Sequence, residues 1–140
     1  MKAGNALGFS LIEMMIVIAV VALLTALAVP WYRDFVVRSN RTEAINELLN
    51  IAACQERIYQ KLNRYDANRC GASGTTTNGH YTMSMATQNT NQNFVITATA
   101  TGSQTNDTCG NLTYSDQGIK NVSVTATATQ VATCWKGGKI

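Results

Sequence analysis

An apolar segment near the N-terminus constrains this chain more than any other feature. Residues 14–29 carry no charge, and Thr25 is the only polar residue among them. A helix over residues 9–29 would be about 31 Å long at about 1.5 Å per residue, which is enough to cross the hydrocarbon core of a bilayer. Glu13 is the one charge inside this helix. It is a functional candidate by default, because placing a carboxylate in a membrane is costly.

The residues before the apolar segment do not follow the order of an ordinary secretory signal. Such a signal has a charged start, an apolar middle and a cleavage site after that middle. Here the small residue expected at the cleavage site, Gly8, precedes the apolar segment, and Lys2 is the only charge before it. Cleavage after Gly8 would keep the apolar segment in the mature chain and expose a new amine on Phe9. The simpler alternative is a single-pass anchor that contains a chance glutamate.

The string Gly8-Phe9-Ser10-Leu11-Ile12-Glu13 resembles the leader motif of type IV prepilins. The resemblance implies cleavage between Gly8 and Phe9 by an inner-membrane prepilin peptidase, followed by methylation of the Phe9 amine. It further implies that Glu13 of one subunit pairs with the Phe9 amine of another and sets the stagger of subunits in a filament. Within one chain Glu13 is a single helical turn away, so it could also reach its own amine.

Four cysteines lie beyond the apolar segment, at positions 54, 70, 109 and 134. An even number in a small exported domain predicts two disulfides in an oxidising compartment. Three pairings are possible, and we favour Cys54–Cys70 with Cys109–Cys134 because these pairs close short loops. The chain has no Cys-x-x-Cys and a single histidine, His80, so neither a metal site nor a cofactor is expected.

One very long helix is expected to follow the leader, because no glycine occurs between Gly8 and Gly71 and the only proline is Pro30. Pro30 is expected to kink or loosen this helix. A basic joint comes next, with Arg33, Arg38 and Arg41. Positive charge there would ordinarily mark the cytoplasmic side of a membrane. The cysteines indicate the opposite side, and we follow them because Lys2 and the leader resemblance place the N-terminus inside.

Apolar residues recur at helical spacing over residues 41–62, which predicts an amphipathic helix packed on a sheet. Its expected apolar face is Ile45, Leu48, Leu49, Ala52, Tyr59 and Leu62. The period changes to two over residues 80–86 and 94–100, which predicts an antiparallel hairpin. Residues 110–114 fit a third strand, and residues 122–129 fit either a fourth strand or an extended tail. The predicted fold is therefore α+β, a long helix with a protruding apolar half on an antiparallel sheet of three or four strands.

The whole pattern resembles the type IV pilin fold, and the head resembles minor pilins of the PilE type. The strings that carry this second resemblance are Ser39-Asn40-Arg41-Thr42-Glu43-Ala44, Cys54-Gln55-Glu56-Arg57, Cys109-Gly110-Asn111-Leu112-Thr113, Gly118-Ile119-Lys120 and Cys134-Trp135. The resemblance implies a cleaved leader at residues 1–8, a membrane and filament-core half-helix at residues 9–36, and a head with two disulfides at residues 37–140. It also implies insertion in the inner membrane with the head in the periplasm, and later a place in an extracellular pilus beside other pilins.

Two functional classes follow from this resemblance. The first is a structural minor pilin that aids pilus assembly, adhesion or twitching motility, with Phe9, Glu13 and Pro30 in the assembly segment. The second is a competence-type pilin whose head binds extracellular DNA through Lys120, Trp135, Lys136 and Lys139. The net charge of +3 is too small to indicate a nucleic-acid partner by itself. The simpler interpretation is that Trp135 packs in the core and that the three lysines are solvated surface residues.

A major pilin and a type II secretion pseudopilin are further alternatives. An enzyme is not expected, because the chain has no glycine-rich phosphate loop, nucleophile elbow or acid pair.

Overall fold

The computed structural model describes residues 9–140, so the expected leader and Gly8 lie outside the described residues. The chain divides into an N-terminal unit that ends at Phe35 and a second unit, Val36–Ile140, which we call the head. The long helix α1 covers Leu11–Leu62 and continues unbroken through Pro30. The next residue, Asn63, stops the helix: its φ of +49° lies in the left-handed region, and it donates its amide to the Tyr59 carbonyl at 2.8 Å.

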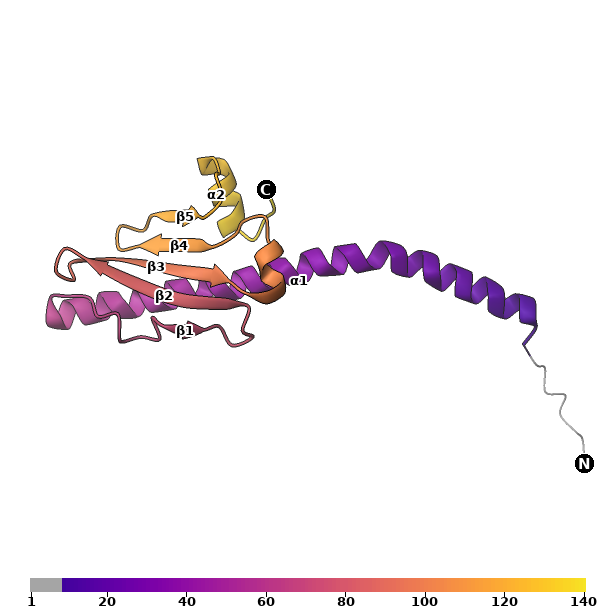
Figure 1. The fold of residues 1–140 in the computed structure, drawn as a ribbon, viewed down its shortest axis with the longest axis horizontal. Coiled ribbons are helices and arrows are strands. Elements are labelled where there is room, and N and C mark those ends of the chain that lie inside the picture. Colours follow the sequence, from indigo (N-terminus) through magenta and orange to yellow (C-terminus); the bar gives the residue numbers. More distant parts are fainter. Residues whose placement is uncertain (1–8) are drawn as a thin grey trace, which may run out of the picture. The chain divides into compact units, whose positions relative to one another are not determined.

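The head contains a five-stranded antiparallel sheet whose spatial order follows the chain, as Figure 1 shows. Its strands are β1 (Gly74–Thr75), β2 (Tyr81–Gln88), β3 (Asn93–Ala100), β4 (Leu112–Ser115) and β5 (Lys120–Val122). The short 3₁₀ helix η1 (Gly102–Asn106) joins β3 to β4, and the helix α2 (Ala128–Trp135) follows β5. The β2–β3 hairpin is the longest ladder, with its ends paired as Tyr81 with Ala100 and Gln88 with Asn93.

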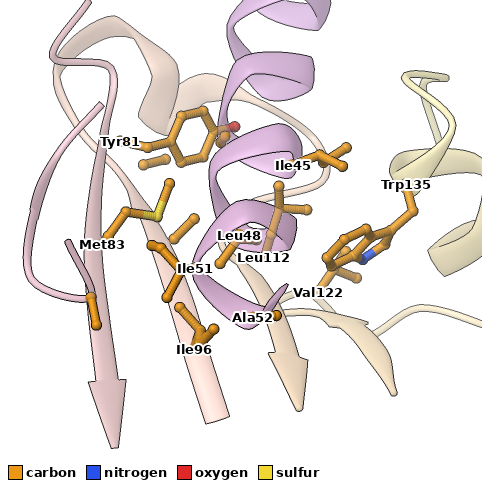
Figure 2. Packing of buried hydrophobic residues seen from close by; sticks show 14 of the residues in the cluster. Ile45, Leu48, Ile51, Ala52, Tyr81, Met83, Ile96, Leu112, Val122 and Trp135 are labelled. Carbon is orange, nitrogen blue, oxygen red and sulfur yellow. The ribbon is translucent and has the colours of Figure 1, made fainter. Parts of the chain in front are cut away.

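The core lies between the second half of α1 and one face of the sheet, as Figure 2 shows. Alternate residues of β2 and β3 point toward the helix, which is the period expected of a half-buried strand. Ala44 and Leu48 of α1 have no exposed surface, and neither do Ile96 and Leu112 of the sheet. The expected α+β class and the helix-on-sheet arrangement are therefore confirmed.

The sheet differs from the prediction at both of its edges. It has five strands rather than three or four, because the connector before residue 80 contributes β1. A strand over residues 122–129 is wrong, since β5 ends at Val122 and α2 begins at Ala128. Thr127 explains the change: its hydroxyl accepts the amide of Gln130, whose side chain accepts the amide of Thr127. This capping box starts a helix in a Thr-Ala-rich stretch that alternates like a strand.

The buried face of α1 is also rotated from the predicted one. Leu49 is 38% exposed and Leu62 is 45% exposed, so neither belongs to the core. The buried face includes Gln55 instead, whose side chain donates to the Asp66 carbonyl at 2.7 Å and accepts the Asp66 amide at 3.0 Å. These bonds replace the solvent contacts of a buried amide. The loop after α1 therefore covers a polar residue that its type alone would assign to solvent.

Both expected cysteine pairs occur as disulfides. Cys54 on α1 joins Cys70 in the loop that follows the helix, with 5.9 Å between their Cα atoms. Cys109 joins Cys134 of α2 across the same Cα distance, and both of these residues are fully buried. The first bridge therefore holds the loop after α1, and the second holds α2 to the segment before β4.

Candidate functional site

The N-terminal half of α1 presents apolar side chains with no partner in the monomer. Within residues 9–140, α1 is the one helix long and apolar enough to cross a membrane, and its most apolar 18-residue window has a mean hydropathy of 2.7 with none of it buried. Leu11, Ile18 and Leu27 are 77%, 68% and 72% exposed. Burial of such a surface is favourable, so this segment is suited to lipid or to other apolar helices.

Three of the predicted assembly residues lie in or next to this segment. Phe9 precedes α1 and is 75% exposed, and Glu13 lies in the first turn of the helix. Pro30 lies inside the helix, where its ring leaves one carbonyl without a backbone donor. Gly8, the expected cleavage position, falls outside the described residues. Phe9 therefore lies just before a helix with an exposed apolar surface, and Glu13 lies in the first turn of that helix.

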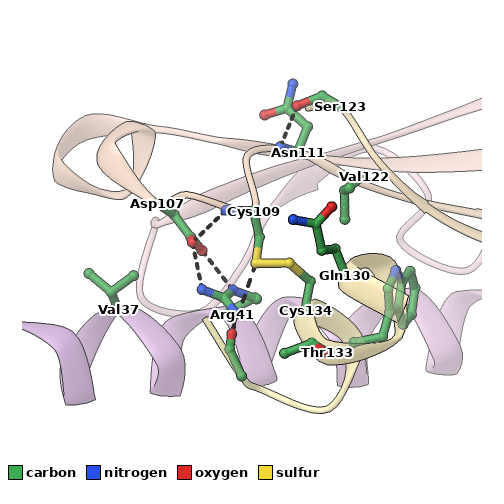
Figure 3. Close-up of a disulfide and its surroundings, with 12 residues drawn as sticks. Val37, Arg41, Asp107, Cys109, Asn111, Val122, Ser123, Gln130, Thr133 and Cys134 are labelled. Carbon is green, nitrogen blue, oxygen red and sulfur yellow. Dashed lines mark hydrogen bonds and ion pairs between the residues drawn. A yellow bond between two sulfur atoms is a disulfide. The ribbon is translucent and has the colours of Figure 1, made fainter. Parts of the chain in front are cut away.

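A buried ion pair, which sequence analysis did not predict, lies where the head half of α1 begins. Arg41 was expected in a polar joint, but it is only 1% exposed and forms a two-pronged pair with Asp107. Its Nε donates to Asp107 Oδ2 at 2.7 Å and its Nη2 donates to Asp107 Oδ1 at 2.5 Å. Its Nη1 donates to the carbonyl of Gly138. Through these bonds Arg41 holds the residue that follows η1, and the C-terminal segment, against α1. Figure 3 shows the pair of Arg41 and Asp107 beside the disulfide of Cys109 and Cys134.

Further donors complete this cluster around the Asp107 carboxylate. Tyr81 Oη donates to Oδ2 at 3.2 Å, Gln104 Nε2 donates to Oδ2 at 3.1 Å, and the Cys109 amide donates to Oδ1 at 3.0 Å. Burial raises the pKa of Tyr81 to about 12, and the negative charge of Asp107 adds to this effect. Among the described residues, no buried side-chain nitrogen or oxygen lacks a partner. The buried polar side chains of this cluster therefore all have hydrogen-bond partners, as a network that holds segments of the head together requires.

The residues predicted to contact DNA gather around α2, but with different exposure. Trp135 is 8% exposed and donates from Nε1 to the Asn121 carbonyl at 3.2 Å, so core packing is the reading that the structure shows. Lys120 is exposed, and its Nζ lies 5.4 Å from the centre of the Trp135 ring. Lys136 and Lys139 are exposed in the segment after α2. The structure brings Lys120 to the Trp135 ring and leaves both of the other lysines on the surface.

A polar pocket that the sequence gave no sign of lies beside the end of α1. It has a volume of about 330 Å³, and Arg64, Asn68, Thr87 and Asn91 are part of its lining. The turn that borders it holds three consecutive residues in the left-handed region, including the β-branched Thr90 at φ +56°. Across residues 9–140 no three metal-ligating side chains come together.

Two family models match this chain over adjoining stretches of its sequence. A model described as "Type IV minor pilin ComP, DNA uptake sequence receptor" matches residues 30–113. A model of the prokaryotic N-terminal methylation motif matches residues 4–29. Lys120, Trp135, Lys136 and Lys139 all follow the residues matched by the first model. The second match includes the predicted cleavage position and Glu13.

Individual proteins that are similar to this chain are named as fimbrial proteins or pilins. The fimbrial protein EcpC of Eikenella corrodens is 39% identical over 93 residues, covering 66% of this chain and 61% of that protein. A fimbrial protein of Neisseria meningitidis serogroup A is 35% identical over 103 residues, covering 71% and 58%. The alignments thus span about three fifths of these proteins. A solved type IV pilin from Shewanella oneidensis matches with a TM-score of 0.52 and 26% identity, covering 64% of this chain and 94% of that one.

Proposed function

This chain belongs to the type IV pilin family whose model is described as the minor pilin ComP, a DNA uptake sequence receptor, and we propose that it serves as a minor subunit of a type IV pilus. In this role the chain is cleaved between Gly8 and Phe9 and methylated at the new amine. It resides in the inner membrane with its head in the periplasm, and it then joins the filament together with other pilins.

The observation that carries this proposal is the exposed apolar half-helix with a single acid in its first turn. Residues 14–29 carry no charged side chain, and their single polar side chain, Thr25, donates its hydroxyl to the Val21 carbonyl of its own helix. Helices of this kind from many copies can bury one another, and contacts that do not close on themselves produce a filament. The head has its own hydrophobic core and is cross-linked by two disulfides, so its packing does not depend on the N-terminal half of α1.

Glu13 has a defined task in this assembly. In a bundle of apolar helices its carboxylate is removed from water, and a buried charge requires a partner of opposite sign. The amine created at Phe9 carries that charge at the same end of the helix. Pairing between Glu13 of one subunit and the Phe9 amine of its neighbour fixes the axial offset of the two chains, because any other offset leaves both charges unpaired.

Sheared pili from cells that express Glu13→Gln test the assembly role. We expect the variant to be cleaved and to reach the membrane fraction normally, with at least about a tenfold loss from the pili, since one unpaired buried charge costs several kcal/mol. Glu47→Gln, on the head half of the same helix, is the matched control and should be incorporated normally. Equal amounts of the Glu13→Gln and control chains in pili would contradict the assembly role.

Mass spectrometry of the chain recovered from pili tests the processing. The expected mass is that of residues 9–140 with one added methyl group and two disulfides. Recovery of a chain that retains residues 1–8 would contradict cleavage after Gly8. The amount of this chain relative to the most abundant pilin in the same sample tests its minor status, which requires it to be a small fraction of the total.

DNA binding by the head is the second candidate function, favoured by the description of the matched family model. Lys120 and Lys136 supply exposed positive charge around α2, while Trp135 is too buried for base stacking.

A gel-shift experiment tests DNA binding. We expect the full chain in detergent to shift a DNA duplex in a gel. The double variant Lys120→Glu, Lys136→Glu should lower the slope of log affinity against log salt by about two. The control Arg57→Glu, Lys61→Glu changes the same charge on α1. A larger loss in the control would assign binding to α1, and no binding at low salt would exclude this function.

A further inference from the structure

A cluster of amphipathic side chains follows the apolar segment directly. Trp31, Tyr32 and Phe35 of α1 are 82%, 70% and 66% exposed, and Arg33 is exposed between them. All four lie in the N-terminal unit of the chain, so the packing of the head does not account for them. Between Phe9 and Trp31 the sequence has no aromatic residue at all. The aromatic residues of this unit are therefore confined to the two ends of the apolar segment.

We propose that Trp31, Tyr32, Arg33 and Phe35 form an interfacial anchor that binds the phospholipid headgroup layer on the head side of the membrane and fixes the depth of the chain. Trp and Tyr rings combine an apolar body with a polar atom, so they collect at the boundary between hydrocarbon and water. A guanidinium pairs with lipid phosphate through two parallel hydrogen bonds. The inference rests on the membrane stage of the proposed function and assigns a task to residues outside the assembly contact.

The depth set by this anchor determines where Glu13 lies before assembly. Eighteen residues separate Trp31 from Glu13, which is about 27 Å along a straight helix and five full turns, so both lie on the same helix face. The hydrocarbon core is about 30 Å thick. With Trp31 at one edge of that core, Glu13 lies within about 3 Å of the other edge, where its side chain reaches headgroups and water.

Two consequences follow from this placement. The carboxylate avoids the penalty of a charge at the bilayer centre, and the Phe9 amine lies about 6 Å further out, in the cytoplasmic headgroup layer. Both groups of the proposed assembly pair are therefore hydrated while the chain waits in the membrane. Their burial happens only when the chain leaves the lipid for the filament.

Fluorescence of Trp31 measures the anchor directly. Trp135→Phe leaves Trp31 as the single tryptophan of the full chain, reconstituted in vesicles of phosphatidylethanolamine and phosphatidylglycerol. Lipids brominated near the carbonyl end of the acyl chain should quench it about twofold more than lipids brominated near the methyl end. Stronger quenching by the deep bromines would overturn the anchor while leaving membrane insertion intact. A complete lack of quenching by either lipid would overturn both the anchor and the membrane stage of the proposed function.

Thiol labelling from the cytoplasmic face tests the predicted depth of position 13. The native cysteines are all paired, so Glu13→Cys adds the only free thiol. A membrane-impermeant maleimide should label this variant several-fold faster than the control Ala19→Cys, whose thiol lies about 9 Å deeper. Equal rates for the two variants would overturn the depth assignment.

Removal of the anchor completes the test. Adding Trp31→Leu, Tyr32→Leu and Arg33→Leu to Glu13→Cys lengthens the apolar segment and should slow labelling several-fold, because the chain is no longer held at one depth. Adding the exchange Trp31→Tyr, Tyr32→Trp preserves the anchor and should leave the rate unchanged. Unchanged labelling after the leucine substitutions would show that other residues set the depth and would overturn the proposal.

Discussion

Replacing Asp107 with alanine should destabilise the head more than any surface substitution, because it leaves the Arg41 guanidinium buried without a counter-charge. Arg41 is 1% exposed and Asp107 is 6% exposed, so water cannot take over the lost contacts. The substitution also removes the acceptor for Tyr81 Oη, Gln104 Nε2 and the Cys109 amide. Breaking a buried pair from one side costs about 3–5 kcal/mol. Domains are typically stable by about 5–15 kcal/mol in total, so this loss is a large share.

The assay is thermal unfolding of the full chain in detergent, followed by near-ultraviolet circular dichroism of the aromatic residues of the head. A loss of 3 kcal/mol or more corresponds to a fall in Tm of at least about 12 °C for a domain of about 100 residues. Arg69→Ala is the matched control. This change breaks the ion pair between Arg69 and Asp66. Because the Arg69 side chain is 62% exposed, the loss should lower the free energy of unfolding by less than about 1 kcal/mol.

A double substitution separates the charge effect from simple loss of contacts. Arg41→Met with Asp107→Leu removes both charges and fills the site with apolar groups, so it should be less destabilising than Asp107→Ala alone. The reasoning would be refuted if Asp107→Ala lowered Tm no more than Arg69→Ala does. It would equally be refuted if the double variant were less stable than Asp107→Ala.

Two further predictions concern the head. Burial raises the pKa of Tyr65 and of Tyr81 from 10.0 to about 12, so their neutral forms stabilise the fold fully below about pH 10, and this contribution is lost as pH rises toward 12. Tyrosinate absorbance should show two late-titrating tyrosines, and urea unfolding should weaken across that window; titration of every tyrosine near pH 10 in the folded chain would contradict this. Gly110→Ala should destabilise more than Gly118→Ala by at least about 1 kcal/mol. Both glycines have positive φ, but only at Gly110 would the new Cβ lie 2.4 Å from Ser123 Oγ. Equal denaturation midpoints for the two alanine variants would contradict the close approach.

The parts of the fold that local pattern could predict are those with a sequence period. The hairpin expected at residues 80–86 and 94–100 is found as β2 and β3, because alternate residues face a single helix. The long helix was likewise predictable from residue spacing. Spacing left three cysteine pairings open, and the favoured short-loop pairs are the ones that form. Local pattern failed at α2, where alternating Thr and Ala satisfied the strand pattern and the capping box at Thr127 decided the outcome.

The buried polar cluster could not be predicted, because its signal is not local. Arg41 and Asp107 are 66 positions apart, and each is of a residue type that usually faces solvent. Gln55 is similar, since only the loop that covers it reveals why an amide belongs in the apolar face of α1. The predicted assembly residues show the opposite balance. Phe9 and Glu13 were proposed from their order in the sequence, and the structure adds that both side chains are exposed.

The order of the strands has a consequence for how the chain folds as it is synthesised. All five strands pair with their neighbours in sequence, so the sheet can form hairpin by hairpin with short loop closures. The helix that covers the sheet, α1, comes first along the chain, whereas Asp107 and Cys134 come late. The apolar face of the second half of α1 therefore stays uncovered until the hairpins have formed, and Arg41 stays without its counter-charge until Asp107 has been added.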